Sequence, residues 1–201
     1  AGYEGRLRRA KVVVDADKRR ELIRAGVAAA AAATAQGASA LIESELLDEV
    51  AALVEWPVPI AGRFEQRFLS LPREVVIATV QDHQRYFPVQ DAGGSLSGWF
   101  VTVSNIESRD PSKIREGNER VVRPRLSDAA FFWDQDRKVR LEAHAARLSG
   151  MTFQTKLGTY ADKTLRVKAL AQLIGHRFGA GPYVARAAEL AKADLMTAMV
   201  G

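Results

Sequence analysis

Hydrophobic residues recur at helical spacing in the first quarter of the chain. Between Asp17 and about Thr34 the apolar residues return every three or four positions, and the many alanines favour a helix. A second helical pattern follows Gly37 and extends from Leu41 to Val54, with acidic residues on its other side. Because two helices joined by a short glycine turn form a helical hairpin, we expect these segments to pack together.

The next segment predicts extended chain and then a third helix. Pro57 and Pro59 exclude helical structure and permit an extended segment. Pro72 suits the start of a helix, and the apolar residues among 75–80 would form its buried side. Their β-branched side chains would also suit a strand, but we favour the helix.

A β-hairpin is the clearest pattern in the chain. The segments Phe87 to Val89 and Trp99 to Val103 are apolar and rich in β-branched and aromatic residues. The sequence "DAGG" between them supplies turn residues. We therefore predict two antiparallel strands at these positions.

Residues 110–148 again show a helical pattern. Pro111 suits the first position of a helix, and Ser127 is a suitable N-cap for a second one. This interpretation leaves a basic turn around Pro124 between the two helices. The aromatic residues at positions 131–133 cannot all face the same way on a helix, and we expect at least two of them in the core.

Gly150 interrupts the helical pattern and marks a predicted domain boundary near residue 149. Two further helical patterns follow it, separated by "GAGP". The predicted fold is α+β for residues 1–149, with a short antiparallel sheet, and all-helical for residues 150–201.

Composition adds a basic surplus to this picture. The net charge is +5 and the pI about 9.7, which favours polyanions such as nucleic acids as partners. The chain has no cysteine, and no apolar run approaches the roughly 20 residues that cross a bilayer. We therefore expect a cytoplasmic protein without a membrane partner, and we expect the chain to be a fragment of a longer one.

The basic segment 113–126 is the main candidate for a binding site. Arginine suits phosphate because its planar guanidinium donates two parallel hydrogen bonds. A structural alternative pairs these arginines with Glu116, Glu119 and Asp128, and a solvated face of ion pairs is the alternative for a second basic cluster just beyond. The candidate phosphate ligands of the two clusters are Lys113, Arg120, Arg123, Arg125, Arg137 and Lys138.

Motifs for catalysis are missing from the sequence. It contains no GxGxxG, Walker or GxSxG motif, and no histidine pattern typical of a metal site. The sequence "QDHQRYF" places Asp82 and His83 in a polar cluster that suits a bound ligand, and a helix end that meets a strand explains this cluster equally well. We therefore predict no metal site and no catalysis by this chain alone.

Three longer stretches resemble the β subunit of bacterial heterotetrameric glycyl-tRNA synthetases. They are "LLDEVAALVEWPVPIAGRFEQRFLSLPREVVIATVQDHQRYFPVQD", "FVTVSNIESRDPSKIREGNERVVRPRLSDAAFFWDQDRK" and "FQTKLGTYADKTLRV". The most specific strings within them are "EGNERVVRPRLSDAAFF" and "KLGTYADKT", and the resemblance runs from about Val13 to the last residue.

This resemblance implies a role that the patterns alone do not show. Such enzymes are α2β2 heterotetramers that join glycine to tRNA(Gly), with ATP and Mg²⁺ bound by the catalytic α subunit and tRNA recognised by the β subunit. The region would be the end of a B3/B4-like domain, followed near residue 150 by the start of a helical HD-like domain. Two functions stay open: a tRNA-binding and assembly module, and a ligand-binding or editing module that uses Asp82 and His83.

Overall fold

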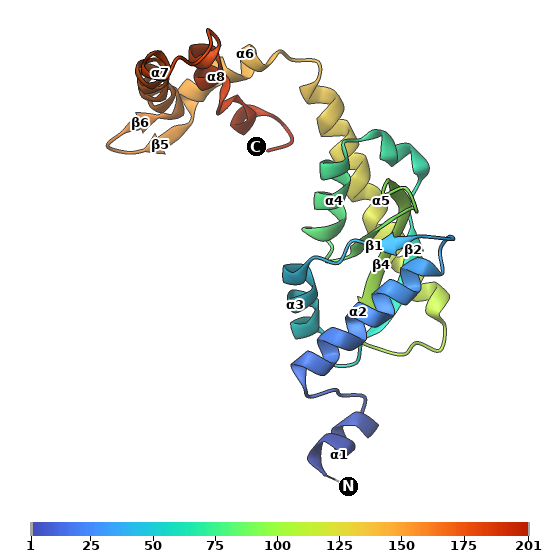
Figure 1. The fold of residues 1–201 in the computed structure, drawn as a ribbon. Coiled ribbons are helices and arrows are strands. Elements are labelled where there is room, and N and C mark those ends of the chain that lie inside the picture. Colours follow the sequence, from blue (N-terminus) through green and yellow to red (C-terminus); the bar gives the residue numbers. More distant parts are fainter. Residues whose placement is uncertain (1, 201) are drawn as a thin grey trace. The chain divides into compact units, whose positions relative to one another are not determined.

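The chain, in a computed structural model that describes residues 2–200, folds into two compact units, Ala1–Ala130 and Phe131–Gly201 (Figure 1). The division falls before the boundary near residue 149 that we expected from Gly150. Residues after 130 pack within the second unit, where the Asp136 carboxylate accepts hydrogen bonds from the backbone N–H groups of Ala198 (2.7 Å) and Met199 (2.9 Å). None of the helices in residues 2–200 is long and apolar enough to cross a membrane.

The first unit is built around a four-stranded antiparallel sheet. Its strands, in the spatial order β1-β3-β4-β2, are β1 (Ser39–Ala40), β2 (Val58–Arg63), β3 (Phe87–Gln90) and β4 (Leu96–Ser104). The predicted hairpin is confirmed as β3 and β4, and in its turn Asp91 Oδ1 accepts hydrogen bonds from the N–H groups of Gly93 and Ser95. The extended segment that Pro57 and Pro59 predicted leads into β2, an edge strand, where proline is tolerated.

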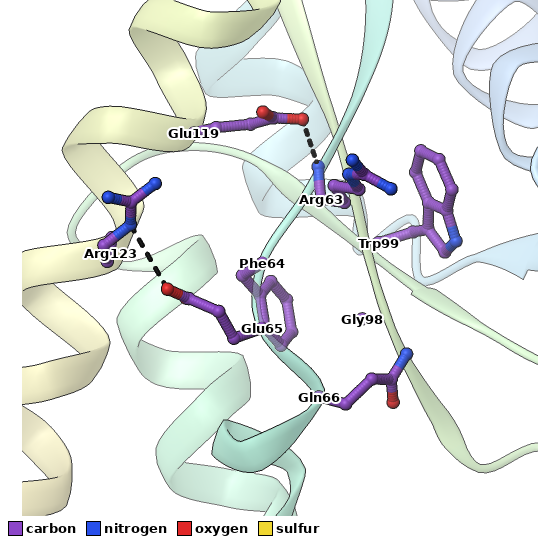
Figure 2. Close-up of a pocket in the computed structure, with 8 residues that line it drawn as sticks. All are labelled: Arg63, Phe64, Glu65, Gln66, Gly98, Trp99, Glu119 and Arg123. Atoms are coloured by element: carbon purple, nitrogen blue, oxygen red, sulfur yellow. Dashed lines mark hydrogen bonds and ion pairs between the residues drawn. The ribbon is translucent and has the colours of Figure 1, made fainter.

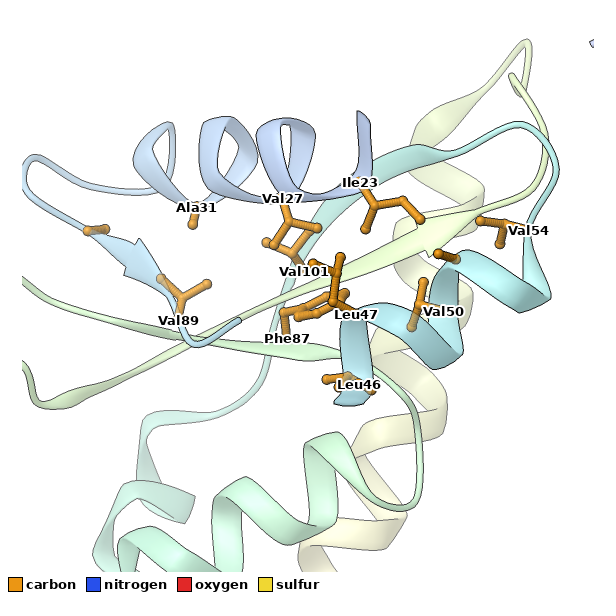
Figure 3. Close-up of a cluster of buried hydrophobic side chains, with 12 residues drawn as sticks. Ile23, Val27, Ala31, Leu46, Leu47, Val50, Val54, Phe87, Val89 and Val101 are labelled. Atoms are coloured by element: carbon orange, nitrogen blue, oxygen red, sulfur yellow. The ribbon is translucent and has the colours of Figure 1, made fainter. Parts of the chain in front are cut away.

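Two helices cover one face of this sheet. They are α2 (Ala16–Ala32) and α3 (Ser44–Leu53), and they enclose a hydrophobic core with β3 and β4 (Figure 3). Val27, Leu47, Phe87 and Val101 are fully buried there. The predicted helical hairpin is only partly right, because the chain forms the strand β1 between the end of α2 and the start of α3. Gly37, at a φ of 76°, turns the chain so that β1 pairs with β3 before α3 begins.

The remaining helices of the first unit follow in chain order. They are α1 (Tyr3–Arg9), η1 (Gln66–Ser70), α4 (Arg73–Gln81) and α5 (Pro111–Asp136), the last of which continues into the second unit. The helix predicted after Pro72 is confirmed as α4, and Val76, Thr79 and Val80 form its buried side.

The helix α5 corrects the interpretation of the basic segment. Residues 111–136 form one continuous helix with Pro124 inside it, where we predicted a turn and a new N-cap at Ser127. Val122, Leu126 and Ala129 recur at helical spacing and are buried, whereas Pro124 is exposed on the other side. Burial of this apolar side favours an unbroken helix despite the hydrogen bond that proline cannot donate.

We predicted an all-helical second part, but the second unit also contains two short strands. Its helices are α6 (Leu141–Ala146), η2 (Arg147–Gly150), α7 (Tyr160–Arg177), α8 (Val184–Leu190) and η3 (Ala193–Met196). Between them, β5 (Thr152–Gln154) and β6 (Gly158–Thr159) form a small antiparallel ladder. The helical pattern that we read after Gly150 begins earlier in the sequence than the helix does in the structure. The helix α7 begins only at Tyr160, because Thr159 and Asp162 form a capping box there. The B3/B4-like and HD-like assignments of the two parts stay predictions.

The aromatic run at the start of the second unit also differs from expectation. Phe131 and Phe132 are 57% and 39% exposed and contact each other edge to face at 5.6 Å between ring centroids. Trp133 is partly exposed. The expectation that at least two of these rings lie in the core is therefore wrong.

Candidate functional site

The four candidate phosphate ligands of the first unit lie on α5, and all four are exposed. Lys113 and Arg120 are about two helical turns apart and project from the same side of the helix. Around the helix axis, Arg123 lies about 60° from Arg120. Arg125 lies roughly 140° from Arg120 in the opposite direction. The four cations therefore spread around the exposed part of the helix instead of lining one row.

Ion pairing separates these arginines into two groups. Arg123 Nε lies 3.3 Å from Glu65 Oε1, an acid of the segment that follows β2. Arg120 and Arg125 have no acidic partner and no side-chain hydrogen bond among residues 2–200. The alternative that the arginines pair with neighbouring acids of their own segment is therefore wrong, and two guanidinium groups stay free for an external anion.

The other candidate cations are weakly paired or lie elsewhere. Lys113 Nζ is 3.9 Å from the Asp110 carboxylate, at the limit of an ion pair, and is exposed. Arg137 and Lys138 follow the end of α5 and belong to the second unit, where both are exposed.

Two side chains of α5 bind the free edge of β2. Glu119 Oε1 accepts a hydrogen bond from the backbone N–H of Arg63 (3.0 Å), and Arg115 Nε donates one to the carbonyl of Ala61 (3.1 Å). The spacing of Arg115 and Glu119 along the helix matches the spacing of Ala61 and Arg63 along the strand. One helical turn rises about 5–6 Å, and two strand residues advance about 6.5–7 Å. These contacts satisfy backbone groups that an edge strand would otherwise leave open. Arg115 and Glu119 are thus structural residues.

A third contact holds α5 through Tyr86. Its ring stacks on the fully buried Phe100 at 5.0 Å between centroids, and its hydroxyl donates a hydrogen bond to Asn118 Oδ1. Burial raises the pKa of the Tyr86 hydroxyl, which keeps it protonated as a donor. The helix that carries Arg120 and Arg125 is therefore anchored at several points within its unit.

A pocket of about 440 Å³ opens where β2 ends, and we name it the β2 pocket (Figure 2). Arg123 lines it from α5, and Arg63, Gln66 and Trp99 line it from β2, the segment after β2, and β4. Arg63 and Trp99 are direct cross-strand partners, so their side chains point to the same face of the sheet. Of these four residues, only Arg123 was a candidate from sequence. The others depend on the register between two strands, which no local pattern reveals.

The pair proposed for hydrolysis does not line the β2 pocket. Asp82 and His83 are both exposed at the C-terminal end of α4, and no hydrogen bond joins their side chains. Among residues 2–200, no group of three or more His, Asp and Glu side chains is placed to hold a metal ion. An editing mechanism through Asp82 and His83 gains no support from this geometry.

A separate ionic cluster lies in the second unit between α6 and α8. Glu142 accepts hydrogen bonds from Arg140 (3.3 Å) and from Arg186. The hydrogen bond from Arg140, and to a smaller extent the other donors around the Glu142 carboxylate, lower the pKa of Glu142 to about 2. Because every charge in this group has a partner within the unit, we regard it as structural.

Comparison with known proteins decides the family. The sequence model of the glycyl-tRNA synthetase beta subunit matches residues 1–201. The chain belongs to the glycyl-tRNA synthetase beta subunit family. It is 54% identical over 190 residues to the glycine–tRNA ligase beta subunit of Marinobacter nauticus, covering 94% of this chain and 27% of that protein. It is 52% identical over 202 residues to the protein of the same name from Azotobacter vinelandii, covering 100% of this chain and 29% of the relative. The chain thus spans less than a third of the length of these family members.

Proposed function

We propose that this chain is a tRNA-binding and assembly part of a glycine–tRNA ligase β subunit and is not catalytic alone. Family membership over residues 1–201 and the net charge of +5 support this function. The observation that carries it is the pair of free guanidinium groups, Arg120 and Arg125, on an anchored helix. Their natural partners are phosphates, which arginine binds with two parallel hydrogen bonds.

The anchoring of α5 matters for this binding. Three side-chain contacts fix the helix to its sheet, so the arginine stems start from fixed positions and less order has to be created on binding. A structured RNA is recognised largely through its shape and its sugar–phosphate backbone. Contacts from a basic helix would therefore contribute affinity and orientation, but they would not distinguish one base sequence from another.

The proposed partners are tRNA(Gly) and the α subunit of an α2β2 heterotetramer in the cytoplasm. ATP and Mg²⁺ belong to the α subunit in this proposal. Among residues 2–200, no three or more ligand side chains are grouped to hold a metal ion. The proposal assigns no chemical step to this chain.

The test replaces both free arginines in the assembled α and β subunits. Arg120→Ala combined with Arg125→Ala should weaken tRNA(Gly) binding, measured between about 50 and 200 mM salt. The slope of log affinity against log salt should fall by roughly 0.7–0.9 for each lost phosphate contact.

Arg24→Ala is the matched control. Arg24 is a partly exposed arginine on α2 that pairs with Glu21 at 3.6 Å. The Arg24→Ala substitution therefore removes one positive charge without touching α5, whereas the test variant removes two. A loss of log affinity in the control about half that of the double variant would show a general charge effect. An unchanged affinity and slope in the double variant would refute the proposed contact.

A further inference from the structure

We propose that the β2 pocket binds a single unpaired nucleotide of an RNA strand, with the base against Trp99 and its phosphate at Arg63. This inference rests on the proposed tRNA-binding function and adds to it a site for a base, where α5 offers only cations for phosphates. The pocket volume of about 440 Å³ lies within the range of small-ligand sites, roughly 300–1,000 Å³. It lies entirely within the first unit.

Trp99 supplies a prepared aromatic surface. Trp99 is partly buried against the hydrophobic core of the first unit and also lines the β2 pocket. Figure 2 shows its indole beside the side chain of Arg63. An indole held by core packing does not have to be ordered when a base stacks on it. Base–aromatic stacking accepts every base, because each has a π face, so Trp99 alone would give affinity without sequence preference.

Gln66 faces the same opening and carries both donors and an acceptor. Its amide lies against Gly98, where an added Cβ would be 2.9 Å from Gln66 Nε2 and 3.0 Å from the carbonyl oxygen of Phe64. The missing side chain at Gly98 therefore leaves the room that this amide occupies. A terminal amide can form two hydrogen bonds with the edge of a base, which an unpaired nucleotide exposes and a duplex does not.

The charges around the pocket suit one phosphate. Glu119 and Glu65 line it as well, but Glu119 binds the backbone N–H of Arg63 and Glu65 pairs with Arg123. The guanidinium of Arg63 has no partner among residues 2–200 and is the free cation of the pocket. A polyphosphate would meet two carboxylates here, whereas a nucleotide with one phosphate can use Arg63 and keep its base near Trp99.

The experiment compares two RNA probes on the assembled α and β subunits. One probe is a short single-stranded oligoribonucleotide, and the other is a blunt duplex of the same length. Trp99→Leu, Gln66→Glu and Arg63→Gln should each weaken the single-stranded probe by about 5- to 100-fold and change duplex binding by less than about twofold. Trp99→Phe keeps an aromatic face and should retain most of the affinity, which separates stacking from core packing.

Irradiation gives a second readout that does not depend on variants. Ultraviolet crosslinking of the single-stranded probe should map to the peptide that contains Trp99. Equal losses for both probes, or crosslinks that map only outside β2 and β4, would overturn the pocket assignment. If the pocket variants behave as expected while Arg120→Ala with Arg125→Ala leaves the salt slope unchanged, the α5 contact fails and the pocket stands. The opposite pattern refutes the pocket and leaves the α5 contact intact.

Discussion

Charged residues that are neighbours in sequence have different roles on α5. Arg115 and Glu119 bind the backbone of β2, whereas Arg120, one position further, has no partner among residues 2–200. In sequence these residues are equivalent members of one basic segment. The difference arises because positions four apart face the same edge strand, while the next residue turns about 100° away. The charge count of the segment therefore overstated the number of cations available to phosphate.

At the scale of a residue, Gly62 should be intolerant of any side chain. A Cβ at this position would lie 2.6 Å from Cζ and 2.9 Å from Cε2 of the fully buried Phe100 ring. Gly62→Ala should therefore lower the free energy of unfolding by about 1–3 kcal/mol through overpacking. Urea denaturation of the β subunit measures this change.

Gly117→Ala is the matching control for that substitution. Gly117 lies within α5, and a Cβ there meets nothing within 4 Å. Alanine should raise the free energy of unfolding by about 0.5–1 kcal/mol, because it reduces the freedom of the unfolded chain and suits a helix. Equal effects of the two substitutions would contradict the close contact at Phe100.

At the scale of elements, the sequence predicted those whose signal is local. The helix α4 and the β3–β4 hairpin follow from spacing and turn residues over a few positions. The strand β1 has two residues and no pattern of its own, so only its pairing with β3 defines it. The continuity of α5 past Pro124 depends on burial of one side of the helix, which local propensity does not contain.

The capping box of α7 gives a prediction for an element boundary. Thr159 Oγ1 accepts the N–H of Asp162, and Asp162 Oδ2 accepts the N–H of Thr159. Thr159→Ala should destabilise the β subunit by about 1 kcal/mol at neutral pH, and Thr159→Ser should retain most of the stability. Chemical denaturation of the three proteins checks this order.

The same box predicts how the loss depends on pH. The backbone N–H and then the hydroxyl of Thr159 hold the pKa of Asp162 below its ordinary value of 3.8. A carboxyl with a lowered folded pKa stabilises the protein above its unfolded pKa and loses this contribution as pH falls through the folded value. The difference in the free energy of unfolding between wild type and Thr159→Ala should therefore become smaller as pH falls below about 3.8. A gap that stays constant into this acidic range would argue against a charged cap.

At the scale of the whole molecule, the candidate site could be predicted only in part. The basic character of α5 and the resemblance to the family are visible in the sequence, and both favour RNA as the proposed partner. The β2 pocket is not visible, because Arg63 and Trp99 are 36 positions apart in the chain and meet only through the β2–β4 register. Prediction of such a site needs the pairing of two strands, and the sequence determines that pairing only through the complete fold.

The largest-scale prediction concerns exchange with a relative. The matching segment of the Marinobacter nauticus glycine–tRNA ligase beta subunit, 54% identical over 190 residues, can be replaced by this chain and combined with the α subunit of that organism. If the chain supplies tRNA-binding and assembly surfaces, the chimera should charge tRNA(Gly) within about tenfold of the parent, a difference in barrier of less than about 1.4 kcal/mol. The same chimera with Arg120→Ala and Arg125→Ala should lose charging through a raised KM for tRNA, with kcat nearly unchanged, because the arginines touch no reacting atom. A chimera that folds and assembles but charges no tRNA would contradict the proposed function, and a loss confined to kcat would contradict the proposed role of the arginines.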